Sequence, residues 1–261
     1  MSLAIITGAS SGIGSEFARQ LKEKCGVDEF WFIARRKENM ESLAEELSVK
    51  AKIISADLTE KSGIEKVREA LMEEKPAVKY LVNCAGFGNF GSFDEIPESD
   101  VEKMIDLNVK ALVLITHMVI PFMERGGKIV ELGSGSCFTP LPYFNTYSSS
   151  KVFVLHYTKS LNFEIKKYGL KAICFCPGGV ETEFLGKACA REDVTMPKAM
   201  KPMLKCSDVV ARCIKAMEKG KTMCVTNWYT KLQHLLFKLV PDVLLTKTWL
   251  TMLKKPNEEQ K

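Results

Sequence analysis

The chain has only three histidines, and its nine cysteines form no C-x-x-C pair. The histidines lie far apart, without the close spacing that metal ligands usually show, so no metal site is expected. An odd number of cysteines disfavours a disulfide framework, and buried free thiols in a reducing compartment are the better interpretation. We therefore expect a cytoplasmic protein without a metal ion.

Long apolar runs and biased segments are also missing. The first residues, MSLAIITGAS, lack the positive segment and long apolar core of a signal peptide. No uncharged apolar run reaches the roughly 18 residues that a membrane-spanning helix needs. There is no repeat of solenoid length, no low-complexity segment and no interleaving of aromatic and basic residues typical of nucleic-acid binding. With 261 residues, 26% of them charged and 46% hydrophobic, the chain has the composition of a globular protein.

Apolar, β-branched segments alternate with amphipathic helical patterns along residues 1–227. Strands that alternate with helices are joined by right-handed crossovers, which predicts a parallel sheet. We predict one α/β domain over 1–227, with a Rossmann-type doubly wound sheet of about seven parallel strands and helices on both faces. The candidate strands lie at residues 3–7, 29–34, 51–58, 78–86, 128–134, 171–179 and 221–227.

A glycine-rich turn, TGASSGIG, follows the first candidate strand. Ligands of such sheets bind beyond the carboxyl ends of the strands. Glycines let the backbone approach a pyrophosphate, and the next helix presents its N-terminal N–H groups to that anion. Because no Lys-Ser/Thr pair follows, a P-loop is excluded. We expect a dinucleotide to be held here by Gly8, Ser10, Ser11, Gly12, Ile13 and Gly14.

The residues after the next two strands bear on which dinucleotide is bound. A carboxylate about 20 residues past the glycines would hold the ribose 2′-hydroxyl of NAD, but this chain has Arg35 and Arg36 there. A guanidinium can bind a 2′-phosphate through two hydrogen bonds, which favours NADP(H) over NAD. The alternative is that the two arginines only begin a solvated helix. After the third strand, Asp57 and Leu58 could bracket the adenine.

Further motifs follow the turn Thr7-Gly8-x-x-x-Gly12-Ile13-Gly14 along the chain: Asn83-Cys84-Ala85-Gly86, Asn108, Ser134, Tyr147-x-x-x-Lys151 and Pro177-Gly178-x-Val180-x-Thr182. Together these motifs resemble the short-chain dehydrogenase/reductase family, in its single-domain branch that includes hydroxysteroid dehydrogenases and 3-oxoacyl reductases. The resemblance covers roughly residues 3–227. Cys84 departs from it, since the family usually has an asparagine there, and so does Ser11, where many NADP-using members have a basic residue.

Tyr147 and Lys151 are one helical turn apart, so their side chains share a helix face. A free tyrosine has a pKa near 10, and a nearby cation favours the phenolate. The resemblance implies that Tyr147 exchanges a proton with the substrate oxygen and that Lys151 also holds the nicotinamide ribose. It further implies that Ser134 hydrogen-bonds the carbonyl oxygen and that Asn108 keeps a water in the proton relay. The remaining cofactor contacts that it implies are Asn83, Ala85, Gly86, Pro177, Gly178, Val180 and Thr182.

Three segments are expected to form the substrate pocket: residues 87–93, 137–145 and 181–205. The first two are aromatic and apolar, and the third is long enough to act as a lid. We predict an NADP(H)-dependent oxidoreductase that interconverts a secondary alcohol and a ketone on a hydrophobic substrate of hydroxysteroid or bile-acid type. The alternative is a 3-oxoacyl thioester reductase. A non-catalytic nucleotide-sensing protein is disfavoured by the intact set of catalytic residues.

Residues 228–261 lie outside the main resemblance and read as an amphipathic helical tail. Leu232, Leu235, Leu236 and Leu239 share one helical face, and Pro241 then breaks the pattern. A second helix follows, with Leu244, Leu245 and Trp249 on its apolar side. The tail could pack on the protein's own body, covering the pocket or a partner subunit; it could bind another protein; or it could lie on an anionic membrane surface. The first is favoured because a long apolar face is usually buried internally.

The helices predicted around Asn108 and after Tyr147 carry more apolar residues than one buried face needs. In the family that the chain resembles, these two helices pair across a two-fold axis. We therefore expect a homodimer or homotetramer.

Overall fold

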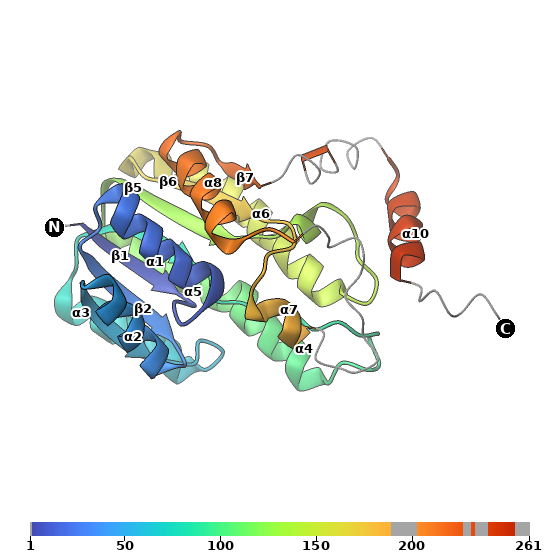
Figure 1. The fold of residues 1–261 in the computed structure, drawn as a ribbon, viewed down its shortest axis with the longest axis horizontal. Helices are drawn as coiled ribbons and strands as arrows, with labels where there is room; N and C mark the ends of the chain where they lie inside the picture. Colours follow the sequence, from blue (N-terminus) through green and yellow to red (C-terminus); the bar gives the residue numbers. More distant parts are fainter. Residues whose placement is uncertain (1, 189–202, 227–230, 233–239, 254–261) are drawn as a thin grey trace.

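The computed structural model describes residues 2–188, 203–226, 231–232 and 240–253. It contains one sheet of seven parallel strands in the order β3-β2-β1-β4-β5-β6-β7, so the predicted fold class is confirmed (Figure 1). The strand order reverses between β1 and β4, because the chain passes from β3 to β4 on the other side of β1. Doubly wound sheets bind their ligands at this point. The strands are β1 (Leu3–Thr7), β2 (Glu29–Ala34), β3 (Lys50–Ser55), β4 (Val78–Asn83), β5 (Met123–Leu132), β6 (Lys171–Cys176) and β7 (Met223–Val225).

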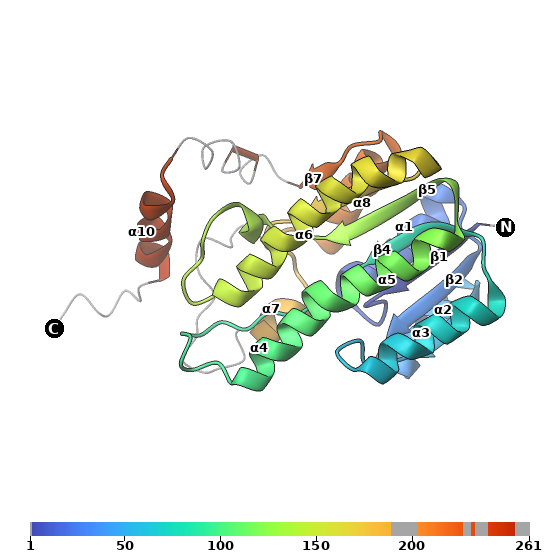
Figure 2. The ribbon, with the colours of Figure 1, turned by 180° about the vertical axis from the view of Figure 1, so that it is seen from behind.

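Helices cover both faces of the sheet, and side chains that alternate along the strands fill the space beneath them. Ile6 packs with Phe17 of α1 (Gly12–Cys25) and with α2 (Lys37–Leu47) and α8 (Cys206–Glu218). Ile5 packs on the opposite face, against α3 (Lys61–Glu74), α5 (Leu112–Val119) and α6 (Asn145–Glu164), which lie together in Figure 2. Strands buried on both faces are apolar throughout, which is why β1 reads as the unbroken run LAIIT.

The helix predicted around Asn108 is present but not uniform. It runs as α4 (Glu98–Ile105), a π-helical segment (Asp106–Ala111), α5 and a short 3₁₀ turn (Ile120–Phe122). β5 begins directly afterwards, earlier than predicted, since Pro121 lacks the N–H that would continue the helix. Within the described part of the chain, Glu98–Phe122 is one helical stretch long and apolar enough to cross a membrane by length and composition. Its Ile115 and Val119 are buried against the sheet.

The second tail helix lies where Pro241 predicts it, as α10 (Asp242–Leu253). Trp249 is buried on its inner side, as predicted. The prediction for Leu244 is wrong, because this residue is 54% exposed. Leu235, Leu236 and Leu239 lie outside the described residues, as do residues 189–202 of the predicted lid. A short helix, α7 (Glu183–Ala188), forms the beginning of that segment.

Candidate active site

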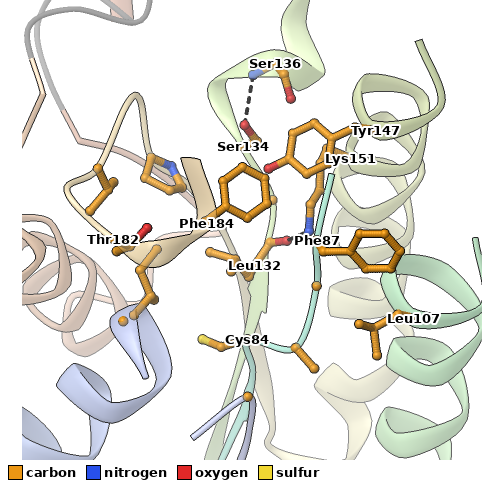
Figure 3. Close-up of a pocket in the computed structure, with 18 of the residues that line it drawn as sticks. Cys84, Phe87, Leu107, Leu132, Ser134, Ser136, Tyr147, Lys151, Thr182 and Phe184 are labelled. Atoms are coloured by element: carbon orange, nitrogen blue, oxygen red, sulfur yellow. Dashed lines mark hydrogen bonds between the residues drawn. The ribbon is translucent and has the colours of Figure 1, made fainter. Parts of the chain in front are cut away.

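A cavity of about 600 Å³ lies beyond the carboxyl ends of the strands, between the glycine turn, α7 and α10. Figure 3 shows its floor, where Ser134, Tyr147 and Lys151 come together beside Phe184. Two predicted site residues, Asn83 and Asn108, do not line it. The predicted residues that do line it are Gly8, Ser10, Ser11, Gly12, Ile13, Gly14, Arg35, Arg36, Asp57, Leu58, Ala85, Gly86, Ser134, Tyr147, Lys151, Pro177, Gly178, Val180 and Thr182.

The glycine turn has no room for side chains at two of its positions. Gly8 has a left-handed backbone (φ +70°), and a Cβ there would come within 2.8 Å of the Ala85 nitrogen. A Cβ at Gly14 would come within 2.3 Å of the Gly8 carbonyl oxygen. The Ser11 side chain does not cap the first turn of α1, which leaves its N–H groups available to an anion. This turn fits the pyrophosphate of a dinucleotide.

The two arginines differ in their surroundings. Arg35 is 74% exposed and lies 3.7 Å from a carboxylate oxygen of Asp57. The Arg36 side chain lies against the glycine turn, where its Nη2 donates to Ser11 Oγ at 2.6 Å. Its Nη1 forms an ion pair with Glu183 of α7 at 3.0 Å. Arg36 is therefore more than the beginning of a solvated helix, because it joins the glycine turn to the segment on the far side of the cavity.

Tyr147 and Lys151 lie one turn apart inside α6, which begins at Asn145. The Lys151 ammonium donates to the Leu132 carbonyl oxygen at 2.8 Å and lies 5.6 Å from the centre of the Tyr147 ring. Burial raises the pKa of Tyr147 above its ordinary value, and the Ser134 hydroxyl acts in the opposite direction. Burial also lowers the pKa of Lys151 to about 8. Desolvation thus outweighs the expected effect of the lysine charge on the phenol.

Ser134 is oriented by the turn that follows β5. Its Oγ accepts a hydrogen bond from the Ser136 N–H at 3.2 Å, as drawn in Figure 3. Because one lone pair of the oxygen is used in this way, the hydroxyl proton is directed elsewhere. Ser134 can therefore donate to an oxygen placed beside Tyr147.

Asn83 and Asn108 are buried and do not line the cavity. Asn108 is fully buried in the π-helical segment, where its amide exchanges hydrogen bonds with the Phe87 N–H (3.0 Å) and carbonyl (2.8 Å). A Cβ at Gly86 would come within 2.9 Å of Asn108 Oδ1 and 3.5 Å of Lys151 Nζ, so these groups meet at one point. Asn83, predicted as a cofactor contact, instead bonds within the core, because its side chain points away from the cavity between β4 and α5.

An aromatic wall beside Tyr147 was only partly anticipated. Phe144 stacks on Tyr147 (centroids 4.4 Å apart) and on Phe90 (3.9 Å), and Phe184 lies on the other side of Tyr147 at 5.3 Å. Trp249 of α10 extends the wall, 6.5 Å from Phe90, and its Nε1 donates to the Pro142 carbonyl at 2.9 Å. Segments 87–93 and 137–145 were expected in the pocket. The tail was expected to pack on the protein's own body, and Trp249, on the apolar side predicted for its second helix, lines the cavity.

Within the part of the chain that the structure describes, no group of three or more His, Cys, Asp or Glu side chains could hold a metal ion.

Comparison with known proteins agrees with this arrangement. The family model described as short chain dehydrogenase matches residues 2–193. The chain is 35% identical over 191 residues to sulfoacetaldehyde reductase 2 of Chromohalobacter salexigens, covering 70% of this chain and 74% of the relative. It is 28% identical over 267 residues to the very-long-chain 3-oxoacyl-CoA reductase of Anas platyrhynchos, covering 98% and 80%. A solved short-chain dehydrogenase from Sphingobium yanoikuyae, in complex with NADPH, is similar with a TM-score of 0.79 and 25% identity, covering 99% and 98%. The chain therefore belongs to the short-chain dehydrogenase family of NAD(P)-dependent oxidoreductases.

Proposed function

We propose that the protein is an NADP(H)-dependent enzyme that interconverts a ketone and a secondary alcohol on a flat, hydrophobic substrate of hydroxysteroid or bile-acid type. The observation that carries this proposal is the part of the aromatic wall that lines the cavity near Tyr147, formed by Phe144, Phe184 and Trp249. Such a surface buries a planar apolar body and offers few polar groups to a sugar or a small acid.

In the proposed reaction, NADPH supplies the hydride and the chain's own residues bind and protonate the substrate. Ser134 donates a hydrogen bond to the ketone oxygen. The Tyr147 hydroxyl gives up its proton to that oxygen as the carbon is reduced, and it takes a proton back in the reverse direction. Lys151, held at the Leu132 carbonyl, places a positive charge near the tyrosinate as it forms.

The residues that would hold the pyrophosphate, the 2′-phosphate and the carboxamide of the cofactor all line the cavity. The glycine turn of α1 would take the pyrophosphate. Arg35 and Arg36 at the end of β2 would contact the 2′-phosphate, and Val180 with Thr182 would contact the carboxamide. NADP(H) is preferred in this proposal because no carboxylate follows β2 at the position that suits a 2′-hydroxyl.

A second candidate is the reduction of a long-chain 3-oxoacyl thioester. It is favoured by the similarity to the very-long-chain 3-oxoacyl-CoA reductase, because that match covers 98% of this chain and so includes the tail. An acyl chain could lie along the same apolar wall.

A substrate panel separates the two candidates. Purified protein is mixed with NADPH and with ketosteroids, long-chain 3-oxoacyl-CoA thioesters or simple ketones, and the loss of NADPH absorbance is followed. The first proposal requires the highest kcat/KM on the polycyclic ketones. A higher value on the thioesters would replace it with the second, and no turnover on any of these would contradict both.

A further inference from the structure

β5 carries a carboxylic acid in the middle of the core. Glu131 has no exposed surface, although an unpaired buried carboxylate is among the costliest groups a fold can contain. Its oxygens lie 3.2 and 3.3 Å from the amide nitrogen of Asn83 on β4, and one of them lies 2.8 Å from the hydroxyl oxygen of Thr116 on α5. The mechanism proposed above does not use this acid.

The hydrogen bonds around Thr116 indicate where a proton must be. Its Oγ1 lies 2.8 Å from Glu131 and also 2.8 Å from the carbonyl oxygen of Leu112, and it accepts from the Asn83 amide at 2.9 Å. The hydroxyl has one proton, and the Leu112 carbonyl can only accept. Both contacts are satisfied together if Glu131 carries a proton and donates it to Thr116. If Glu131 were ionised, the single Thr116 proton could serve only one of the two contacts. At the other contact, the Thr116 oxygen would face a second acceptor, either the Glu131 carboxylate or the Leu112 carbonyl.

This cluster is connected to the wall of the cavity. Thr7, Asn83 and Glu131 are register neighbours across β1, β4 and β5, near the carboxyl ends of the strands. The Thr7 hydroxyl lies 3.4 Å from the Asn83 side-chain oxygen and accepts from the N–H of Ala85, which lines the cavity.

A second connection runs along β5 itself. The residue after Glu131 is Leu132, whose carbonyl oxygen holds the Lys151 ammonium. A shift of the strand at Glu131 would therefore move a contact of the predicted catalytic lysine.

We propose that Glu131 is held as a neutral acid and serves as a positioning residue, fixing the Ala85 backbone through Asn83 and Thr7 and the Leu132 carbonyl beneath Lys151. The effect on turnover rests on the proposed function. The protonation state of Glu131 and its effect on cofactor binding do not.

The titratable groups around Glu131 are Lys151 and Tyr157 on α6 and Cys84 after β4. Burial raises the pKa of Glu131 to about 8, and its hydrogen bonds with Thr116 and Asn83 and the charge of Lys151 act against burial more weakly. In the unfolded chain the pKa of a glutamate is about 4.3. Between these values the unfolded chain has released the proton and the folded protein has kept it. Stability from this group is therefore lost as the pH rises from about 4.3 to about 8.

Glu131→Gln tests the neutral acid without needing a substrate. Glutamine can donate to Thr116 and accept from Asn83, and it does not ionise. Relative to the unmodified protein, the folding equilibrium constant of Glu131→Gln should rise by up to about tenfold per pH unit between about pH 4.3 and pH 8. Glu69→Gln, at an exposed position of α3, is the matched control and should follow the unmodified protein. The free energy of unfolding is measured by urea denaturation at each pH. If its difference between Glu131→Gln and the unmodified protein stays constant across this range, Glu131 is not a neutral acid in the folded protein.

The positioning role is tested by NADPH affinity and by the pH profile of kcat/KM on the best substrate of the panel. As the pH rises through about 8, both proteins should lose NADPH affinity, because Lys151 loses its charge in the same range. The unmodified protein should lose more affinity than Glu131→Gln, because only it also ionises residue 131. Glu131→Ala should bind NADPH more weakly at every pH. If Glu131→Gln changes the stability curve but matches the unmodified protein in affinity and in kcat/KM at each pH, Glu131 is not a positioning residue. Absence of turnover with NADPH binding intact would contradict the proposed function and leave this inference standing.

Discussion

The guanidinium of Arg36 lies 3.0 Å from the Glu183 carboxylate, so a side chain at the end of β2 is joined to α7 across the mouth of the cavity. Both side chains are partly exposed, and such pairs contribute only about 0–1 kcal/mol. A 2′-phosphate on a bound dinucleotide would compete with Glu183 for the same guanidinium. We therefore expect the pair to affect cofactor preference more than stability.

Arg35→Asp should shift the preference from NADPH toward NADH, because a carboxylate suits a 2′-hydroxyl and repels a phosphate. Arg36→Asp should act in the same direction and also lose the hydrogen bond to Ser11. The ratio of kcat/KM for the two cofactors is the measurement, with Lys61→Asp on α3 as a charge-matched control. If the unmodified protein uses NADH and NADPH equally well, the assignment of the arginines is wrong.

Glu183→Gln should tighten NADPH binding by roughly twofold to fivefold, the range that a surface ion pair of up to 1 kcal/mol allows. NADH affinity should stay the same, since NADH carries no 2′-phosphate. Fluorescence titration of both cofactors is the measurement, and Glu181→Gln, an exposed acid two residues away, is the control. An equal change for both cofactors would show that Glu183 acts on the shape of the cavity and not on Arg36.

Tyr147→Phe keeps the ring in the aromatic wall and removes the proton that the reaction needs. Turnover should fall by about 10²–10⁴-fold, the usual contribution of a general acid, while NADPH still binds. Tyr143→Phe is the matched control, because Tyr143 lies four residues away and is largely exposed. A Tyr147→Phe variant with most of its activity would end the assignment.

Trp249→Ala should raise KM for a flat hydrophobic substrate while leaving NADPH affinity unchanged, because Trp249 packs against Phe90 and not against the glycine turn. Leu244→Ala, on the exposed side of the same helix, should change neither quantity. A Trp249→Ala variant with unaltered KM would show that α10 does not contribute to the substrate pocket. Binding of the full-length protein to anionic vesicles at low salt, with unaltered KM, would favour the membrane-surface interpretation of the tail.

We propose that the protein is a homodimer or homotetramer that pairs through the outer faces of α4 and α6. Ile105 and Phe153 are 48% and 43% exposed there, which is unusual for large apolar side chains that lie close together. Phe153→Glu should lower the mass measured by light scattering at micromolar concentration. Phe93→Glu, an exposed phenylalanine in a loop, should not. A monomeric mass for the unmodified protein would contradict the proposal.

Much of this protein is determined by local patterns in its sequence. The alternation of strands and helices predicts the parallel sheet because both periodicities are read within about ten residues. The glycines of TGASSGIG and the spacing of Tyr147 and Lys151 are also local, since a tight turn and a helix face need no distant partner. Together with the family resemblance, these features named about half of the residues that line the cavity.

The tertiary structure decided which distant residues meet. Trp249 reaches the carbonyl of Pro142 across 107 positions, and Arg36 reaches Glu183 across 147. Glu131 reads as one acid in an apolar strand until the register of β4 and β5 places it beside Asn83. The Asn83 side chain likewise points into the core, where it bonds to Thr116 and Glu131. The sequence analysis had predicted that Asn83 contacts the cofactor. Such pairings depend on the order of strands in the sheet and on how helices pack over it, and these follow from burial of the whole chain and not from any short segment of it.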